Sequence, residues 1–158
     1  NRKARSSLRE LTGNYRVEIP ERVSFRVPRS VFDRGNDLVL EDDEACEALD
    51  VDSRLDRYAL AIDDYTEVVR LDPDFDLIYL RRGAAYLGLG DTERAISDFD
   101  EAIRLAPDKA AGAYAGRAKV LTLRGRHTQA QEAVEQAVEL GLDRTLLEEE
   151  IENLKRWR

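Results

Sequence analysis

The chain has 158 residues, about one domain, with 25 lysines and arginines against 33 aspartates and glutamates. The net charge of −8 argues against a general nucleic-acid-binding protein, and the single cysteine excludes an internal disulfide and two-cysteine metal motifs. The sequence contains no run of about 18 apolar residues that could span a membrane.

Residues 1–41 form a basic N-terminal arm that differs from the rest of the chain. Residues 1–34 carry nine basic and four acidic side chains, a net charge of +5, whereas the remaining residues carry a net charge of −13. Apolar and polar residues alternate over 15–27, which predicts a β-hairpin with its turn at 20–22. A lone hairpin is marginal in water, so we expect the arm to lie on the helices or on another chain. The alternating apolar residues are Tyr15, Val17, Ile19, Val23, Phe25 and Val27.

The helical part of the chain begins with a predicted helical hairpin over 42–75. Its second helix is indicated by the segment AIDDYTEVVRLDP at 61–73, which has one apolar face and ends in proline. The first helix, predicted over 42–55 with a turn after it, fits less well. Asp56 stands where the next unit has Gly90.

Residues 76–109 repeat this unit at a spacing of 34 residues, measured from Ala61 to Ala95. The segment AISDFDEAIRLAP at 95–107 shares Ala, Ile, Asp, Glu, Arg, Leu and Pro with the earlier copy at equal offsets. The preceding stretch, 76–89, has two apolar stripes, which predicts a helix that packs on both sides. The unit is therefore a helix, a glycine-containing turn and a second helix.

This unit resembles the tetratricopeptide repeat. The resemblance covers about 42–158 and implies an all-α fold, a right-handed superhelical solenoid of helical hairpins. A single hairpin cannot bury its own apolar face, so stacked units share a continuous core. Two positions depart from the usual pattern, with tyrosine in place of tryptophan and arginine in place of leucine. The matching positions, these two first, are Tyr79, Arg82, Gly83, Tyr86, Ala95, Phe99 and Pro107.

Two further helical segments complete the chain. Residues 111–142 resemble a third unit, so that three hairpins span 42–142. Residues 143–158 predict a capping helix, because leucine and isoleucine side chains share one face and acidic residues the other. The matching residues of the third unit are Tyr114, Ala118, Leu121, Gly125, Ala130, Val134 and Ala137.

The family resemblance implies a binding surface on the concave side, lined by the first helix of each unit. Some family members grip a partner's C-terminal carboxylate there with Lys, Arg and Asn. This chain has Leu80 and Ala84 in the second unit and Gly112 and Gly116 in the third, so we expect no such clamp. The apolar groove suits an amphipathic helix or an apolar strand, or it is covered by the chain's own arm. The expected groove residues are Leu77, Leu80, Ala84 and Leu87, then Ala115, Lys119 and Thr122, and in the first unit Cys46, Asp50 and Ser53.

Catalytic and metal sites are not indicated by the sequence. Cys46 and His127 would fall on helices that are not neighbours in the repeat order, so we interpret them as a buried apolar residue and a surface residue. The aspartates at 72–76 and 50–52 lack the glycine and glutamate of a calcium-binding loop. We therefore expect no cofactor, no metal and no small-molecule substrate.

The sequence thus predicts a non-catalytic protein–protein interaction module, such as an adaptor, scaffold or assembly factor, with a protein or peptide partner. Two alternatives stay open: a permanent structural subunit of a large complex, and a fragment of an enzyme whose catalytic part lies outside this chain. The chain contains no methionine, so we expect the native protein to start upstream of residue 1, where a targeting segment can lie. The expected location is the cytoplasm or an organelle interior.

Overall fold

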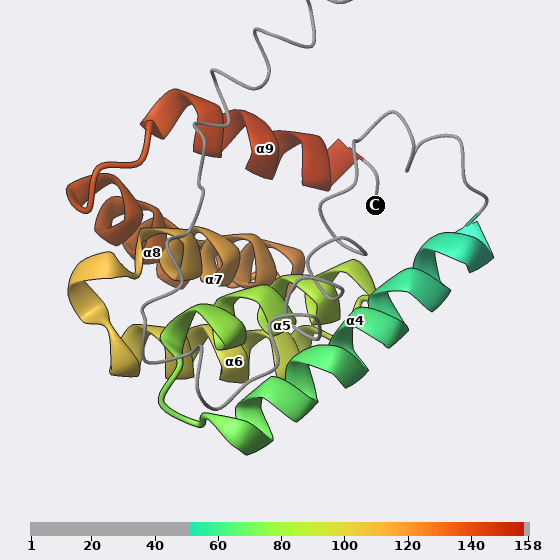
Figure 1. Cartoon of the computed structure of the whole chain (residues 1–158). Coiled ribbons are helices and arrows are strands. Elements are labelled where there is room, and N and C mark those ends of the chain that lie inside the picture. Colours follow the sequence, from blue (N-terminus) through green and yellow to red (C-terminus); the bar gives the residue numbers. More distant parts are fainter. Residues whose placement is uncertain (1–50, 157–158) are drawn as a thin grey trace, which may run out of the picture.

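The computed structural model describes residues 51–156, which form a stack of α-helices (Figure 1). No strand occurs within this range, so the all-α prediction is confirmed for it. The predicted arm and its hairpin over 15–27 lie outside the described residues. The helices are α4 (Val51–Leu71), α5 (Asp76–Gly88), α6 (Thr92–Leu105), α7 (Ala111–Leu123), α8 (His127–Glu139) and α9 (Arg144–Arg156), with a short 3₁₀ turn, η2 (Pro107–Lys109), between α6 and α7.

The helices stack in chain order. Helix α5 packs on α6 and α7 packs on α8, and these two hairpins join through contacts of α6 with α7 and of α5 with α7. Helix α4 packs on α5 at one end of the stack, and α9 packs chiefly on α7 at the other (Figure 1). This is the solenoid arrangement that the repeated sequence predicts, because each helix pair buries its apolar face against the next.

The first hairpin is the place where the sequence prediction is wrong. Helix α4 runs without interruption from Val51 to Leu71, through the turn that was predicted after a helix over 42–55. Asp56 occupies the position that glycine holds in the next unit, and without glycine the left-handed turn conformation is disfavoured. The helix therefore extends through the position of the expected turn.

The turns inside the two complete hairpins are built alike. Gly90 and Gly125 follow α5 and α7 with φ angles of 79° and 73°, in the left-handed region that glycine enters without strain. Each donates its N–H to the carbonyl three residues earlier, at 2.9 and 3.0 Å. The next residue donates to the carbonyl five residues before it, at 2.9 Å in both turns, which completes a Schellman motif. Asp91 then caps α6 by accepting a hydrogen bond from the Arg94 N–H at 3.1 Å.

The core changes character along the stack. Around α4, α5 and α6 it holds the largest fully buried side chains, including Tyr65, Ile78 and Phe99. Between α7, α8 and α9 it consists mainly of alanines, with Leu121, Leu147 and Ile151 supplying most of the bulk. Alanine permits close approach of helix backbones but buries less apolar area per residue, so the α7–α8 hairpin depends more on α9 for coverage.

Candidate functional site

Helix α5 presents two different faces. Ile78, Tyr79, Gly83 and Ala85 are buried against neighbouring helices. The predicted groove residues lie along another face at intervals of three or four residues, the spacing of one side of an α-helix. Three of them, Leu77, Leu80 and Leu87, are half-buried, and the fourth, Ala84, is exposed. We call these four residues the α5 strip.

Two close approaches join α5 to neighbouring helices, one at Leu80 of the α5 strip and one at Gly88 beside it. A β-carbon built on Gly112 of α7 would lie 3.3 Å from Cδ2 of Leu80, so this leucine rests on the α7 backbone. At the other end, a β-carbon on Gly88 would lie only 2.5 Å from the ring of Tyr58, which reaches over from α4. The strip is therefore an apolar surface held between α4 and α7.

The predicted groove residues of α7 are placed differently. Ala115 and Thr122 are buried, with 8% and 5% of their surface exposed. Lys119 forms an ion pair with Glu150 of α9, with 2.6 Å between Nζ and Oε2. Leu147 and Ile151 of α9 complete the apolar cluster that contains Ala115. Among the described groove residues, Ala115 and Thr122 are thus covered, whereas Lys119 is half-buried like the three leucines of the α5 strip. The binding role of all these residues stays a prediction.

The groove residues expected in the first unit are not tested by the structure. Cys46 and Asp50 lie outside the described residues. Ser53 lies in the first turn of α4, and its side chain is not among the described ones. His127 begins α8 and is exposed, as the sequence interpretation expected.

A buried ion pair fixes α5 on α6. Nε and Nη2 of Arg82 donate to the two carboxylate oxygens of Asp98, both at 2.8 Å, and Nη1 reaches Oγ1 of Thr66 in α4 at 3.2 Å. The guanidinium also lies 5.7 and 5.9 Å from the ring centroids of Tyr79 and Tyr86. The hydrogen bonds to Asp98 raise the pKa of Arg82 above its ordinary value. The sequence showed Arg82 only as a departure from the repeat pattern, and its partner was missed.

Ion pairs between other helices were also missed by sequence reasoning. Arg124, which directly follows α7, pairs with Glu93 of α6 at 2.5 Å, and Arg117 of α7 pairs with Asp100 of α6 at 3.2 Å. The partners in each pair lie on different helices, so the sequence offered no local spacing that could have found them.

Neither a metal site nor a membrane span is found among residues 51–156. Within this described range, no three His, Cys, Asp or Glu side chains gather closely enough to hold an ion. None of the helices described is both long and apolar enough to cross a membrane.

The fold is that of a helical-repeat protein, in which successive helical hairpins pack on one another. The family model for the tetratricopeptide repeat matches residues 77–109. Residues 77–109 thus form a tetratricopeptide repeat, and the described helices on both sides of it stack as in tetratricopeptide-repeat domains.

Curated proteins with similar sequences include a repeat-containing co-chaperone and a heat shock protein. The chain is 35% identical over 74 residues to the tetratricopeptide repeat and J domain-containing co-chaperone DNJ1 of Cryptococcus neoformans, a match that covers 47% of this chain and 14% of that protein. It is 41% identical over 58 residues to heat shock protein STI1 of Saccharomyces cerevisiae, which covers 36% of this chain and 10% of that protein. The chain thus matches less than a fifth of these longer proteins, and neither match indicates an enzyme family.

Solved structures with the same fold extend the comparison. The first tetratricopeptide-repeat domain of Spaghetti (RPAP3), bound to the HSP90 peptide SRMEEVD, superposes with a TM-score of 0.64 at 20% identity, covering 84% of this chain and 96% of that one. The second such domain of human RPAP3, in complex with the HSP70 peptide SGPTIEEVD, gives 0.61 at 26% identity over 80% and 93% of the two chains. The Sgt2 domain of Aspergillus fumigatus gives 0.62 at 23% identity over 84% and 82%.

Proposed function

We propose that this protein is a non-catalytic interaction module whose α5 strip binds an apolar segment of a partner protein. The observation that carries the proposal is the partly exposed row of Leu77, Leu80, Ala84 and Leu87 on a helix that α4, α6 and α7 hold in place. Three leucines spaced along one helix suit the apolar face of a partner helix or an extended apolar peptide. The similarity to co-chaperone repeat domains supports a protein or peptide as the partner.

The proposed partner differs in charge from the peptides bound by the similar structures. Those peptides end in the acidic sequence EEVD. The α5 strip carries no cation, and Lys119 on α7 is already paired with Glu150. An acidic peptide end would thus gain little electrostatic attraction along this strip, so we propose that an apolar segment binds here in preference to an acidic C-terminus.

A photo-crosslinking amino acid at position 84 tests this proposal directly, because Ala84 is the exposed member of the strip. The same amino acid at Glu149, exposed on α9, serves as the control. The partner crosslinked from position 84 but not from 149 is identified by mass spectrometry and titrated as a purified protein. Peptide SRMEEVD is titrated in parallel and is expected to bind weakly or not at all.

Substitutions then assign the contact to the strip. Leu80→Glu and Leu87→Glu are expected to weaken the purified partner's binding at least tenfold, because each places a charge in an apolar contact. Leu146→Glu is the matched control, since Leu146 is 59% exposed on α9. Unchanged binding in both strip variants, with the fold intact by circular dichroism, would place the partner elsewhere. Tight binding of SRMEEVD would contradict the preference for an apolar segment.

A further inference from the structure

Two arginines stand at equivalent positions of successive units but have different surroundings. Arg82 of α5 and Arg117 of α7 are 35 residues apart, the same offset that separates Ala95 from Ala130. The side chain of Arg82 is 14% exposed and is held by the carboxylate of Asp98 through two hydrogen bonds. The side chain of Arg117 is 38% exposed. The same guanidinium position is thus closed in one unit and open in the next.

The difference comes from one residue in the second helix of each unit. The residue 35 positions after Asp98 is Ala133 of α8, which has no carboxylate. Arg117 turns instead to Asp100 of the preceding helix, with 3.2 Å between Nε and Oδ1. This contact is an ion pair by distance but not a hydrogen bond: among the described residues, the buried Nε of Arg117 has no hydrogen-bond partner. Arg117 therefore lacks the two-oxygen acceptor that its counterpart has.

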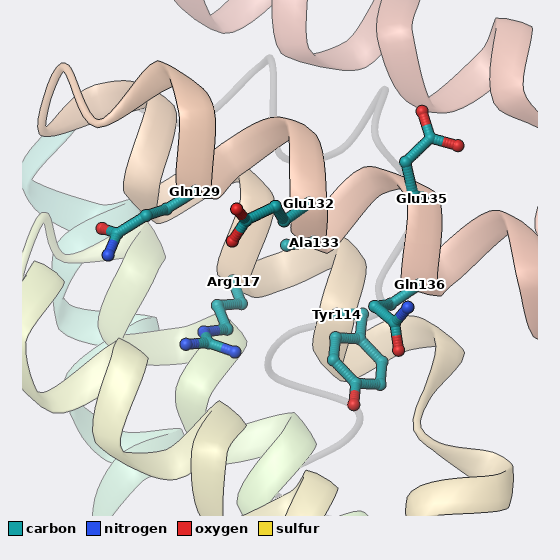
Figure 2. Close-up of a pocket in the computed structure, with 7 residues that line it drawn as sticks. All are labelled: Tyr114, Arg117, Gln129, Glu132, Ala133, Glu135 and Gln136. Carbon is teal, nitrogen blue, oxygen red and sulfur yellow. The ribbon is translucent and has the colours of Figure 1, made fainter.

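A cavity lies where that acceptor is missing. It has a volume of about 470 Å³ and is lined by Arg117 and Tyr114 of α7 and by Ala133 and the polar side chains around it on α8. Figure 2 shows Gln129 and Glu132 on the α8 side of Arg117, with Gln136 beside the ring of Tyr114. We call this cavity the Arg117 pocket.

The Arg117 pocket is separate from the surface that the proposed function uses. Arg117 and Lys119 lie two residues apart on α7, so they project roughly 200° apart around the helix. None of the residues that line the pocket belongs to α5. The proposal below does not rest on the α5 strip.

The charges near the pocket decide what it can hold. Glu135 is engaged by Arg144 of α9, with oxygen–nitrogen distances of 2.8 and 2.5 Å, so its charge is balanced. Glu132 has no ion pair among the described residues and is exposed at the edge of the cavity. Glu132 and Asp100 weaken the attraction for any anion, so a carboxylate binds here only by pairing directly with the guanidinium of Arg117.

We propose that the Arg117 pocket binds the side-chain carboxylate of an aspartate or glutamate on a partner protein, with the guanidinium of Arg117 as the principal donor. The partner's carboxylate takes the place that Asp98 fills in the preceding unit. A planar guanidinium pairs with two carboxylate oxygens at once, which favours a carboxylate over a single-point acceptor.

Nuclear magnetic resonance of the full chain tests this with three blocked tripeptides. The first is Ac-Gly-Glu-Gly-amide, the second has glutamine in place of glutamate, and the third has glutamine and a free C-terminal carboxyl group. We expect the Nε–Hε signal of Arg117 to shift in a saturable way with the first peptide only. Equal shifts with the glutamine amide, or no saturable shift with any peptide, would refute the pocket. A stronger response to the third peptide would refute the assignment to a side-chain carboxylate.

Variants separate the pocket from a general charge effect. Ala133→Asp supplies an internal carboxylate, so it is expected to abolish the peptide-induced shift of Arg117, and circular dichroism checks that the fold persists. Arg117→Gln is expected to abolish the peptide-induced shifts of the Tyr114 and Ala133 amides, and circular dichroism checks that the fold persists. Glu132→Gln is expected to tighten binding severalfold, whereas Glu149→Gln, an equal charge change on α9, leaves it unchanged. Equal gains from both glutamine variants would show that only net charge matters and would overturn the proposal.

Discussion

The ring of Phe99 packs directly on the backbone of Gly116. A β-carbon built on Gly116 would lie 2.4 Å from Cζ of the ring, and one built on Gly83 would lie 2.9 Å from Cε1. Phe99 of α6 thus fills the space that two glycines leave in α5 and α7. The size of the Phe99 side chain therefore determines how closely α5 and α7 pack on α6.

Gly116→Ala is expected to destabilise the protein although alanine favours helices. The added methyl group overlaps the ring of Phe99, and overpacking of a core costs about 1–3 kcal/mol, which exceeds the roughly 1 kcal/mol gained in helix propensity. Gly112→Ala on the same helix is the control, because the nearest atom there is the flexible end of Leu80 at 3.3 Å. Urea unfolding should rank Gly116→Ala below the parent and Gly112→Ala near it or above. The reverse order would mean that the ring moves aside freely.

Truncation of Phe99 should cost more than truncation of Tyr86. Phe99 is 2% exposed, so Phe99→Ala is expected to cost about 3–5 kcal/mol. Tyr86 is half-buried and stacks with Arg82 and Arg94 at 5.9 and 5.5 Å, so its loss should cost about half as much. Thermal unfolding followed by circular dichroism measures both. Equal melting temperatures for the two variants would contradict the burial difference.

The buried pair of Arg82 and Asp98 should behave as a unit. Asp98→Ala leaves a buried guanidinium without its carboxylate, and breaking such a pair costs about 3–5 kcal/mol. Arg82→Leu, which restores the usual leucine of the repeat, leaves Asp98 only 6% exposed and unpaired. The double variant removes both charges and is expected to be more stable than Asp98→Ala alone. A double-mutant cycle in urea gives the coupling, and simple additivity would show that the pair does not act as a unit.

The link between α8 and α9 should weaken in acid. Hydrogen bonds from Arg144, and then from Gln131, lower the pKa of Glu135 from 4.5 to about 2. Because the folded pKa is depressed, the stabilisation is fully present above about pH 4.5 and is lost as the pH falls through about 2. Glu135→Gln should therefore lower the Tm at pH 7 and have a steadily smaller effect at pH 4 and pH 3.

Glu149→Gln is the control for this titration, since Glu149 is exposed on α9. Its effect on the Tm is expected to stay small at every pH. A Glu135→Gln effect that is constant from pH 7 to pH 3 would mean that the carboxylate does not carry the link.

The repeat itself could be predicted from the sequence because its signals are local and periodic. Ala95, Phe99 and Ala102 recur at helical spacing, and Asp91 and Pro107 mark where α6 can begin and end. The uninterrupted α4 could not be predicted in the same way. The repeat register called for a turn near Asp56, and the absence of glycine there was a weaker signal than the register.

The exposure of the expected groove residues differs between α5 and α7 for a tertiary reason, and their role in binding stays a prediction. The apolar spacing of Leu147 and Ile151 showed that the last helix needs a surface to cover, but the sequence does not say which surface. The structure shows α9 over Ala115 and Thr122 of α7. The contrast between Arg82 and Arg117 was visible as two arginines one repeat apart, yet its meaning depends on Asp98 and Ala133 facing them.

The glycines of the Schellman turns have a backbone conformation that depends on the chirality of the residue. Gly90, Gly125 and Gly141 have φ angles of 79°, 73° and 101°. An L-residue with a side chain is strained at such φ angles, whereas a D-residue adopts them without steric strain. D-alanine introduced at these positions by chemical synthesis would restrict the unfolded chain without disturbing the folded one, and so would stabilise it. At these three turns, a D-amino acid therefore suits the backbone better than any L-amino acid with a side chain does.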